Sequence, residues 1–436
     1  MNNYRPIFLL SVFSELLEKI LKLRLVKFIK KTFQLDHGQY GFQKGSSTLG
    51  ATVDLLEYVS GEMDKNKYVI TVFVDLQKAF DTVNIDLLLD KLYKMGCRGI
   101  CYELLKSYST NRQQYTSVNN SNSETAEVEV GVAQGSVLGP LQYLLYVHSL
   151  KYVGLKAKYF MFADDTVLVY SSENQNELQT IINTDLKNYF KWLCYNRLSI
   201  NAEKTIYMVI KQKGTNNPVI HINKVVLKEV MEYKYLGLII QNNLSWNAHV
   251  NSIISRVSPM VGAIRRCSHQ FNNKVKSLIY NSFIEPHLRY LIPCWGNTTE
   301  YLLNKLQRLQ NKAVKAVNQL NFYTPSEQLY RDHHILKIKQ IKTLEQTKLI
   351  NSIQKALLKT NVVLKLSKDS HTHNTRTKKN MNEQAITKKK TRFHNLQKHT
   401  NFNAIPKSIL DIYRYIYIYI YIYIYIYIYI YIYNIL

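Results

Sequence analysis

The sequence has few cysteines, and none of them is spaced for a metal site. The five among 436 residues are Cys97, Cys101, Cys194, Cys267 and Cys294. They form no CxxC pair and no cysteine–histidine spacing typical of zinc sites, and their odd number argues against a disulfide framework. The pattern excludes a small secreted disulfide-bonded domain and predicts reduced thiols.

The N-terminal residues also lack the uninterrupted apolar run of a secretory signal peptide. Arg5 and Pro6 come early. Glu15, Glu18 and Lys19 then interrupt the apolar residues that follow. We therefore predict an intracellular protein, located in the nucleus, the cytoplasm or both.

Acidic residues are scarce relative to basic ones. The chain has 31 Asp and Glu against 57 Lys and Arg, which gives a net charge of +26. Such an excess favours a polyanionic partner, with nucleic acid ahead of a membrane surface. At 436 residues the chain is long enough for two or three domains with cores of their own.

Two apolar stretches rich in β-branched residues contain carboxylates at the expected ends of strands. Residues 68–76 read as a strand that ends near Asp75, and residues 159–170 read as two strands joined at Asp164 and Asp165. A surface turn is the plain alternative for the adjacent pair, because Asp is favoured in turns. Three carboxylates at strand ends, however, match the all-oxygen ligands of hard divalent cations. Two such ions about 3.5–4 Å apart make a phosphoryl-transfer centre.

The same residues carry a family resemblance. Residues 162–165 (FADD) resemble motif C of reverse transcriptases, residues 74–83 resemble motif A, and residues 131–140 (GVAQGSVLGP) are similar to motif B. The three motifs stand in the family's order, and the resemblance extends over about residues 4–336. The chain looks like the reverse transcriptase of a non-LTR retrotransposon of the jockey or CR1 type. It also looks N-terminally truncated and without the endonuclease domain of such elements.

The resemblance implies an RNA-directed DNA polymerase with an α+β right-hand polymerase fold: an antiparallel palm sheet backed by helices, partial fingers and a helical thumb. It implies that Asp75, Asp164 and Asp165 hold two Mg²⁺ ions. The reaction would be attack of a primer 3′-hydroxyl on the α-phosphate of a dNTP. The expected partners are an RNA template, a DNA primer and dNTPs, with no membrane and no specific protein partner.

The resemblance also assigns contacts with the incoming nucleotide to Arg5, Leu76, Phe80, Gln134 and Gly135. In the family, an Arg at the place of Arg5 holds the triphosphate, and an aromatic residue at the place of Phe80 excludes a 2′-hydroxyl. Gly135 lets the backbone approach the nucleotide closely. A solvated terminal side chain is the alternative for Arg5, and a core position is the alternative for Phe80.

Lys204 stands where motif D of the family has a lysine. It could donate a proton to the leaving pyrophosphate, and general-acid help of this kind is worth roughly 10²–10⁴-fold. A plain surface lysine is the alternative. Asp81 is expected at the start of a helix rather than as a metal ligand.

Some residues depart from the family pattern. Gln43 and Ser46 stand where Arg is usual, and Ala133 replaces a usual Pro. With the short N-terminus, these changes keep open a catalytically inactive retrotransposon relic that binds nucleic acid only. A group II intron-type maturase is a weaker alternative.

The composition along the chain predicts five regions. They are partial fingers over residues 1–67, a palm with motifs A to E over 68–246, a basic helical thumb over 247–354, a poorly ordered basic tail over 355–410, and a Tyr-Ile repeat over 411–436. The repeat matches translation of a TA dinucleotide repeat. Its alternating tyrosines argue against a membrane span, although its length would allow one.

Overall fold

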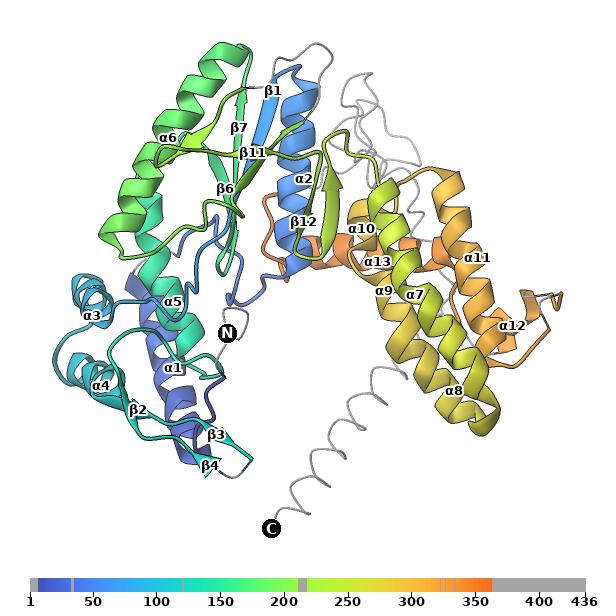
Figure 1. Cartoon of the computed structure of the whole chain (residues 1–436), viewed down its shortest axis with the longest axis horizontal. Helices are drawn as coiled ribbons and strands as arrows, with labels where there is room; N and C mark the ends of the chain where they lie inside the picture. The colour runs from blue at the N-terminus through green and yellow to red at the C-terminus, as the bar shows by residue number, and fades with distance from the viewer. Residues whose placement is uncertain are drawn as a thin grey trace, which may run out of the picture. The chain divides into compact units, whose positions relative to one another are not determined.

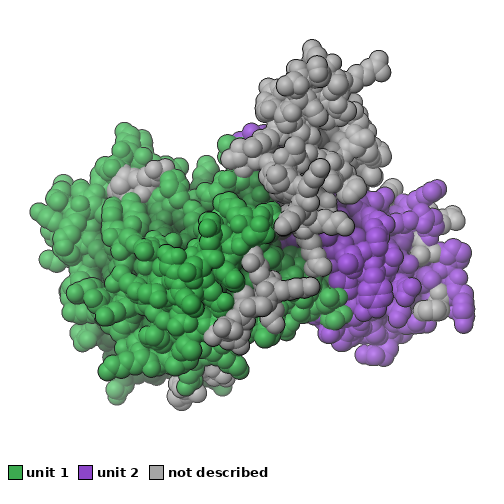
Figure 2. All heavy atoms as spheres, turned by 90° about the horizontal axis from the view of Figure 1, so that it is seen from above, with its two compact units in different colours: residues 1–251, 356–362 green, residues 252–355, 363–436 purple. Residues whose placement is uncertain are grey.

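The computed structural model describes residues 7–32, 35–119, 121–210, 218–321, 323–325, 327–332 and 335–362. The chain divides into two compact units (Figure 2). Unit 1 comprises residues 1–251 and 356–362, and unit 2 comprises residues 252–355 and 363–436. Unit 1 is therefore discontinuous in sequence, because the chain leaves it after residue 251 and returns to it at residue 356.

A five-stranded sheet in the order β11-β8-β1-β7-β6 forms the centre of unit 1 (Figure 1). Its strands are β1 (Tyr68–Val74), β6 (Lys158–Phe162), β7 (Asp165–Ser172), β8 (Ile206–Ile210) and β11 (Lys228–Glu229). The pairs β1–β7, β1–β8 and β6–β7 are antiparallel, and β11 pairs with β8 in parallel. The β-branched and aromatic residues of β1 and β7 suit a strand that is buried on both faces.

Helices cover both faces of this sheet. Around it lie α2 (Thr48–Asp64), α3 (Ile85–Lys94), α5 (Gly139–Val147), α6 (Gln175–Tyr195) and the hairpin of β12 (Glu232–Tyr235) and β13 (Leu238–Gln241). Buried residues of α3, α5 and α6 form one core with Val72 and Leu168 of the sheet. On the other face, the Tyr58 ring of α2 lies 6.1 Å from that of Phe160, and Tyr233 of β12 lies 4.1 Å from Phe73.

Smaller elements complete unit 1. They are α1 (Val12–Thr32), α4 (Gly99–Ser109), β2 (Arg112–Gln114), β3 (Ser117–Val118), β4 (Ser121–Asn122), β5 (Ala126–Val128), β9 (His221–Ile222) and β10 (Val225–Val226). Side-chain caps fix several helix starts. Ser47 accepts from Gly50 N at the start of α2, and Asn84 accepts from Leu87 N at the start of α3.

Unit 2 is helical in its described part. Its elements are α7 (Asn247–Cys267, which begins in unit 1), α8 (Asn273–Ile279), a π-helical turn (Tyr280–Ile284), α9 (Glu285–Arg289), α10 (Ile292–Trp295), α11 (Glu300–Val317), α12 (Glu327–Asp332) and α13 (Ile338–Gln354). The α11 helix buries a stripe that includes Leu302, Leu306, Leu309 and Ala313, with the three- and four-residue spacing of an amphipathic helix.

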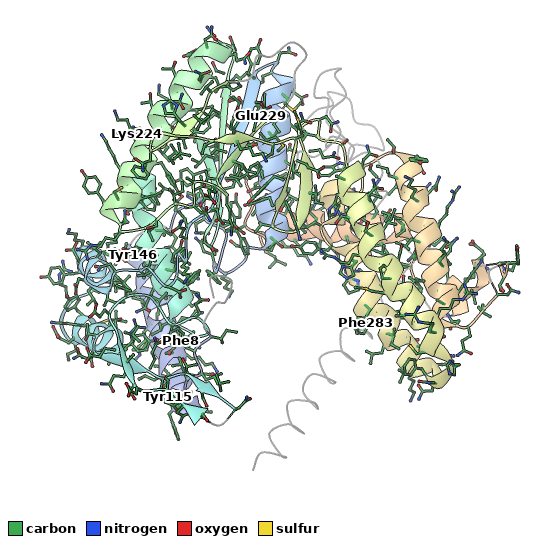
Figure 3. All side chains as sticks on the ribbon, viewed as in Figure 1. Phe8, Tyr115, Tyr146, Lys224, Glu229 and Phe283 are labelled. Atoms are coloured by element: carbon green, nitrogen blue, oxygen red, sulfur yellow. The ribbon has the colours of Figure 1, made fainter. Side chains whose placement is uncertain are left out.

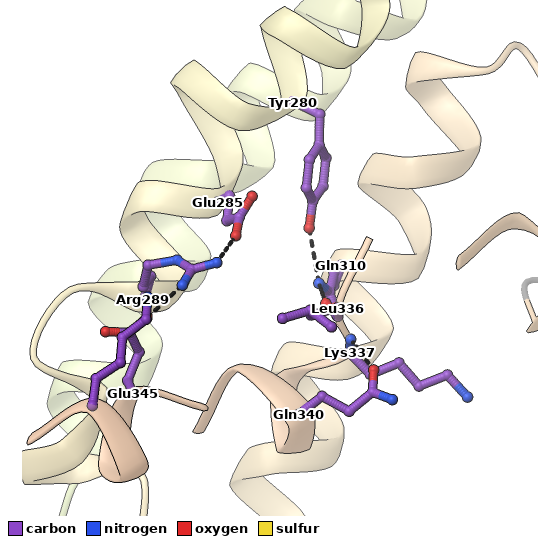
Figure 4. A network of polar contacts seen from close by, with 9 residues as sticks. Tyr280, Glu285, Arg289, Gln310, Leu336, Lys337, Gln340 and Glu345 are labelled. Atoms are coloured by element: carbon purple, nitrogen blue, oxygen red, sulfur yellow. Dashed lines mark hydrogen bonds and ion pairs between the residues drawn. The ribbon is translucent and has the colours of Figure 1, made fainter. Parts of the chain in front are cut away.

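Buried polar groups tie the helices of unit 2 together (Figure 4). Gln310 is fully buried, and its Nε2 donates to the Tyr280 hydroxyl at 2.8 Å and to the Leu336 carbonyl at 2.7 Å. Arg289 forms ion pairs with Glu285 and Glu345. Arg289 is therefore held inside the unit by two carboxylates, unlike Arg265 and Arg266, which are exposed.

The α+β class predicted from the sequence is confirmed by this mixture of helices and antiparallel strands. The expected helix start at Asp81 is wrong, because α3 begins at Ile85 with Asn84 as its cap. Residues 356–362 also differ from the expected disordered tail, since they pack in unit 1. The rest of that tail, the Tyr-Ile repeat and Arg5 lie outside the described residues. Within the described ranges, no helix has the length and apolar character needed to cross a bilayer.

Candidate active site

The adjacent carboxylates lie at the turn between β6 and β7. Phe162 pairs with Asp165, so that Ala163 and Asp164 alone form a two-residue turn. Ala163 has a φ of 59°, a left-handed conformation that non-glycine residues seldom adopt. A positive φ at the first central residue is what a type II′ hairpin turn requires. The turn presents Asp164, which is half-buried, and Asp165, which is exposed.

Gln39 holds this strained turn from the side. It is 3% exposed, and its Oε1 accepts from Ala163 N at 3.2 Å while its Nε2 donates to Ala163 O at 3.4 Å. The neighbouring backbone adds a hydrogen bond to β6, because Tyr40 N donates to Met161 O at 2.7 Å. The polar loop around Gln39 (residues 35–47, the Gln39 loop) therefore lies along the edge of β6 next to the two carboxylates. Nothing in the sequence identifies Gln39 as the residue that anchors this loop.

Asp75 lies at the same end of the sheet. The last pair in the β1–β7 register is Val74 with Thr166, so Asp75 and Asp165 are the next residues beyond it. The backbone of Asp75 is fixed on both sides, because its N donates to Thr205 Oγ1 at 3.3 Å and its O accepts from Asn201 N at 2.9 Å. The register thus brings the three carboxylates to one edge.

The charge of this edge reaches two tyrosines, the half-buried Tyr233 and the buried Tyr143. Burial, and then the negative charges of Asp165 and Asp75, raise the pKa of Tyr233 to about 12. Burial and Asp164 likewise raise the pKa of Tyr143 well above its usual range. Because Asp75 and Asp165 both act on the Tyr233 hydroxyl, their negative charges lie near one another, and a nearby cation would be favoured.

The donor set fits a hard divalent cation by its chemistry. Asp75, Asp164 and Asp165 supply carboxylate oxygens, the ligands that Mg²⁺ prefers. Their side chains are not gathered into a ligand sphere: across the described residues, no group of three His, Cys, Asp or Glu lies close enough to hold a metal ion. The structure contributes the backbone placement of the three acids.

Phe80 lies in an aromatic stack rather than alone. Its ring stacks on that of Tyr143 in α5, with 4.4 Å between centroids and 19° between planes. Phe42 meets the Phe80 ring edge-on, with 5.9 Å between the two ring centroids. Tyr143 is 1% exposed and Phe80 is half-buried, so a buried ring backs Phe80 from behind. This stacking fixes the direction of the Phe80 ring.

The loop that precedes α5 is held by two hydrogen bonds of Gln134. Gln134 Nε2 donates to Asp81 Oδ1 at 2.7 Å, and Gln134 O accepts from the amide of Phe8 at 2.8 Å (Figure 3 labels Phe8). Gly135 has a φ of 105°, and a Cβ there would stand 3.0 Å from Phe8 O. Glycine is required at this position by its backbone conformation.

Glu18 of α1 is a further support that the sequence did not reveal. It is 1% exposed, and its Oε2 accepts from the amides of Val137 at 2.6 Å and Leu138 at 3.0 Å. Its Oε1 accepts from the Tyr108 hydroxyl at 2.9 Å. A carboxylate bonded to backbone amides at a helix start is electrostatically favoured. Glu18 therefore fixes the end of the Gln134 loop.

Two other residues assigned by resemblance belong to segments that contact the backbone around Asp75. Leu76 is 8% exposed and bridges to Ile200, and the hydrogen bonds of this bridge are made by the neighbouring residues. Lys204 is exposed in the turn that follows, where its N donates to Asn201 Oδ1 at 3.3 Å. Asn201 is the residue bonded to Asp75, so one turn carries both Lys204 and the support of Asp75.

The chain belongs to the reverse transcriptase (RNA-dependent DNA polymerase) family, whose match covers residues 1–240. This membership agrees with the right-hand polymerase class predicted from the sequence. Solved structures give only a weak likeness: apo telomerase from Candida tropicalis aligns with 78% of this chain and 58% of its own, at 12% identity and a TM-score of 0.42.

Three of the curated relatives are named as RNA-directed DNA polymerases of mobile elements. The probable RNA-directed DNA polymerase from transposon BS of Drosophila melanogaster is 30% identical over 78% of this chain and 38% of its own length. That from transposon X-element of the same species is 28% identical over 76% of this chain and 37% of its own. The polymerase from mobile element jockey of Drosophila funebris is 26% identical over 77% and 38%. The chain thus spans less than two fifths of the length of these relatives.

Proposed function

We propose that this protein is the RNA-directed DNA polymerase of a retrotransposable element. Its family membership and its resemblance to the polymerases of transposons BS and X-element support the reaction class. The single observation that supports the proposal is the strand register, which puts the backbones of Asp75, Asp164 and Asp165 at one end of the central sheet. The reaction is attack of a primer 3′-hydroxyl on the α-phosphate of a dNTP, with loss of pyrophosphate.

Asp75, Asp164 and Asp165 would hold two Mg²⁺ ions. When bound, the ions would lower the pKa of the attacking hydroxyl and neutralise charge on the phosphate. The protein supplies the fixed placement of the acids. The turn at Thr205 holds the backbone of Asp75, and Gln39 holds the turn that carries Asp164.

Phe80 would exclude a 2′-hydroxyl from the nucleotide sugar. Its support is the stack on Tyr143, which leaves the ring little freedom to move aside. The pocket thereby selects deoxynucleotides by shape, a steric form of discrimination. The Leu76 backbone would lie near the triphosphate, on the strand end that carries Asp75.

Gln134 and Gly135 would contact the base and sugar of the incoming nucleotide. Their loop is held by Asp81 and by the amide of Phe8, so it is preorganised for a ligand. Arg5 would bind the triphosphate, because a guanidinium fork matches phosphate oxygens. Lys204 would donate a proton to the leaving pyrophosphate from its exposed turn.

RNA template and DNA primer would be the macromolecular partners. The net charge of +26 supports a polyanion. Exposed cations of unit 2 would track backbone phosphates, and they include Arg256, Arg265, Arg266, Lys274, Arg308 and Lys312. In this assignment unit 1 carries the fingers and palm, unit 2 carries the thumb, and the protein acts in the nucleus, the cytoplasm or both.

Primer extension by the full chain tests the proposal. The assay uses a DNA primer on an RNA template with dNTPs and Mg²⁺, and it compares the wild type with Asp75→Asn. We expect templated extension by the wild type and a loss of about 10³-fold or more in the variant, as for groups that act directly on the transition state. A wild type that binds the primer–template but extends nothing would overturn the proposal in favour of a nucleic-acid-binding relic.

A further inference from the structure

The chain returns to unit 1 after its helical insertion, and this return segment (residues 356–362) is bound by polar contacts. Lys359 N donates to Gly45 O at 2.7 Å, which docks the segment on the loop that precedes α2. The segment lies more than a hundred residues beyond the family match, which covers residues 1–240. Family resemblance therefore gives no role to it.

The ammonium group of Lys359 is surrounded by oxygen atoms of the Gln39 loop. Its Nζ donates to Gln39 O at 2.7 Å, to Gln43 Oε1 at 3.0 Å and to Asp36 O at 3.2 Å. It also lies 5.3 Å from the centroid of the Tyr40 ring. An ammonium has three donors, and here each one has an acceptor. Lys359 thus brings a positive charge to Gln43, where the family usually has an Arg.

Asp54 of α2 anchors the same segment from the other side. It is 4% exposed, and its Oδ2 accepts from Asn361 N at 2.8 Å, from Asn361 Nδ2 at 2.9 Å and from the Tyr40 hydroxyl at 2.5 Å. Its Oδ1 accepts from the Thr360 hydroxyl. A buried carboxylate with four donors is a strong and specific contact.

Two glycines leave room for the segment. A Cβ at Gly50, inside α2, would stand 2.8 Å from the carbonyl oxygen of Lys359. A Cβ at Gly45 would stand 3.2 Å from that of Leu357. Glycine inside a helix costs stability relative to alanine, so the close approach gives Gly50 a structural reason. The loop and α2 are shaped for a backbone lying against them.

Gln39 links the return segment to the turn that carries the carboxylates. Lys359 binds the backbone of Gln39, and the Gln39 side chain holds the N and O of Ala163. Ala163 has the strained positive φ of the turn that presents Asp164. A strained turn persists only where its surroundings hold it. Lys359 therefore binds the backbone of the residue whose side chain fixes this turn.

We propose that Lys359 is a positioning residue of the nucleotidyl-transfer site. It fixes Gln39, and Gln39 fixes the Ala163 turn and with it the carboxylates of Asp164 and Asp165. The positioning role rests on the proposed polymerase function, whereas the link from Lys359 to the turn does not. The catalytic hairpin then depends on a segment that follows the helical insertion, so the chain must pass through unit 2 and return before its site is fully held.

Hydrogen–deuterium exchange of the metal-free full chain tests the link without any assay of activity. The variant Lys359→Met keeps the length of the side chain and removes the ammonium. Lys355→Met is the matched control, because Lys355 is exposed just before the segment. We expect peptides covering residues 159–166 to exchange about tenfold faster in Lys359→Met, as for loss of a charge-assisted hydrogen bond, and unchanged in the control. Unchanged exchange in a folded Lys359→Met would overturn the proposal.

A second pair of variants separates positioning from general stability. In Gln39→Leu the turn has lost its holder, so adding Lys359→Met should change exchange at residues 159–166 little further, a non-additive result. Additive effects would overturn the relay through Gln39. If Lys359→Met fails to fold, Lys359→Arg, which keeps the cation and shifts its donors, takes its place in the same cycle.

Polymerase assays then test the role in the reaction. A positioning role predicts that Lys359→Met raises the Mg²⁺ concentration for half-maximal extension several-fold, whereas a lowered fraction of folded protein would leave that concentration unchanged. The latter result would overturn the positioning role. Suppose instead that the wild type has no polymerase activity while Lys359→Met still speeds exchange at residues 159–166. That result would overturn the proposed function and support the link from Lys359 to the turn.

Discussion

The Gln134 side-chain amide donates a hydrogen bond to the Asp81 carboxylate, with 2.7 Å between Nε2 and Oδ1. Gln134 lies in the loop before α5, and Asp81 lies in the turn that follows β1, so the bond joins two segments 53 residues apart. Because the acceptor is charged, the bond is stronger than one between neutral groups. Asp81 thereby determines the direction of the Gln134 side chain.

Replacing Asp81 with alanine should raise the KM for dNTP about tenfold with a smaller change in kcat. Removal of the acceptor releases Gln134 from its bound orientation, and a hydrogen bond to a charged group is worth about 1.5–3 kcal/mol. Steady-state extension on an RNA template at varied dNTP concentration measures both constants. Asp86→Ala, at an exposed position in the first turn of α3, is the control. Equal KM values in the two variants would contradict a role for Asp81.

Replacing Phe80 with alanine should relax sugar selection. The loss of the ring that stacks on Tyr143 opens space for a 2′-hydroxyl. We expect the ratio of rNTP to dNTP incorporation to rise by about 10–100-fold, the range typical of shape-based discrimination. Single-nucleotide incorporation with matched rNTP and dNTP measures the ratio. Phe42→Ala removes the outer ring of the same cluster, so an equally large rise there would show that Phe80 has no special role.

The glycines of α2 provide a stability test of the return segment. Gly61→Ala should stabilise unit 1 by about 1 kcal/mol, since a Cβ there meets nothing within 4 Å and alanine is the better helix former. Gly50→Ala should destabilise it by about 1–3 kcal/mol, because the new methyl group approaches the Lys359 carbonyl. Urea unfolding of the full chain followed by circular dichroism compares the two. Stabilisation by both substitutions would show that the segment does not lie against α2.

Glu62 of α2 should make stability fall in acid. Burial favours a raised pKa, but hydrogen bonds from Lys65, Lys67 and Ser171 outweigh it and lower the pKa of Glu62 to about 2. The unfolded value is about 4.3, so the stabilisation is complete above that pH and is lost as the pH falls through about 2. We expect a contribution of about 2 kcal/mol, reduced because the Lys65 side chain is 63% exposed.

The measurement is the urea midpoint between about pH 5 and pH 2. The wild type should lose stability faster across this window than Glu62→Gln, which lacks the titrating group. Glu103→Gln, at an exposed position of α4, should retain the slope of the wild type. A slope that persists in Glu62→Gln would assign the acid sensitivity to other carboxylates.

Local sequence signals predict much of the fold. The apolar run at residues 68–76 became β1, which ends at Val74, and the two strands expected over residues 159–170 became β6 and β7. The placement of Asp164 at a hairpin turn followed from two apolar strands around it. Each of these features depends on neighbours in the chain, such as the period of apolar residues and the caps at helix starts.

The supports of the site were not predictable in this way, because they are long-range contacts. Glu18 binds amides about 120 residues away, and Gln39 binds Ala163 at a separation of 124 residues. Lys359 binds Gln39 at a separation of 320 residues. A single glutamate, glutamine or lysine carries no signal of such a partner in one sequence.

The most direct measurement is primer extension by Asp164→Asn, made beside measured binding of the same primer–template. The central claim is that the carboxylates at the β6–β7 turn carry out nucleotidyl transfer. Asp90→Asn, which removes only an exposed ion pair with Lys94, is the control. The account predicts extension by the wild type and the control, and a loss of about 10³-fold or more in Asp164→Asn with binding retained. Extension by Asp164→Asn at the rate of the wild type would contradict the account.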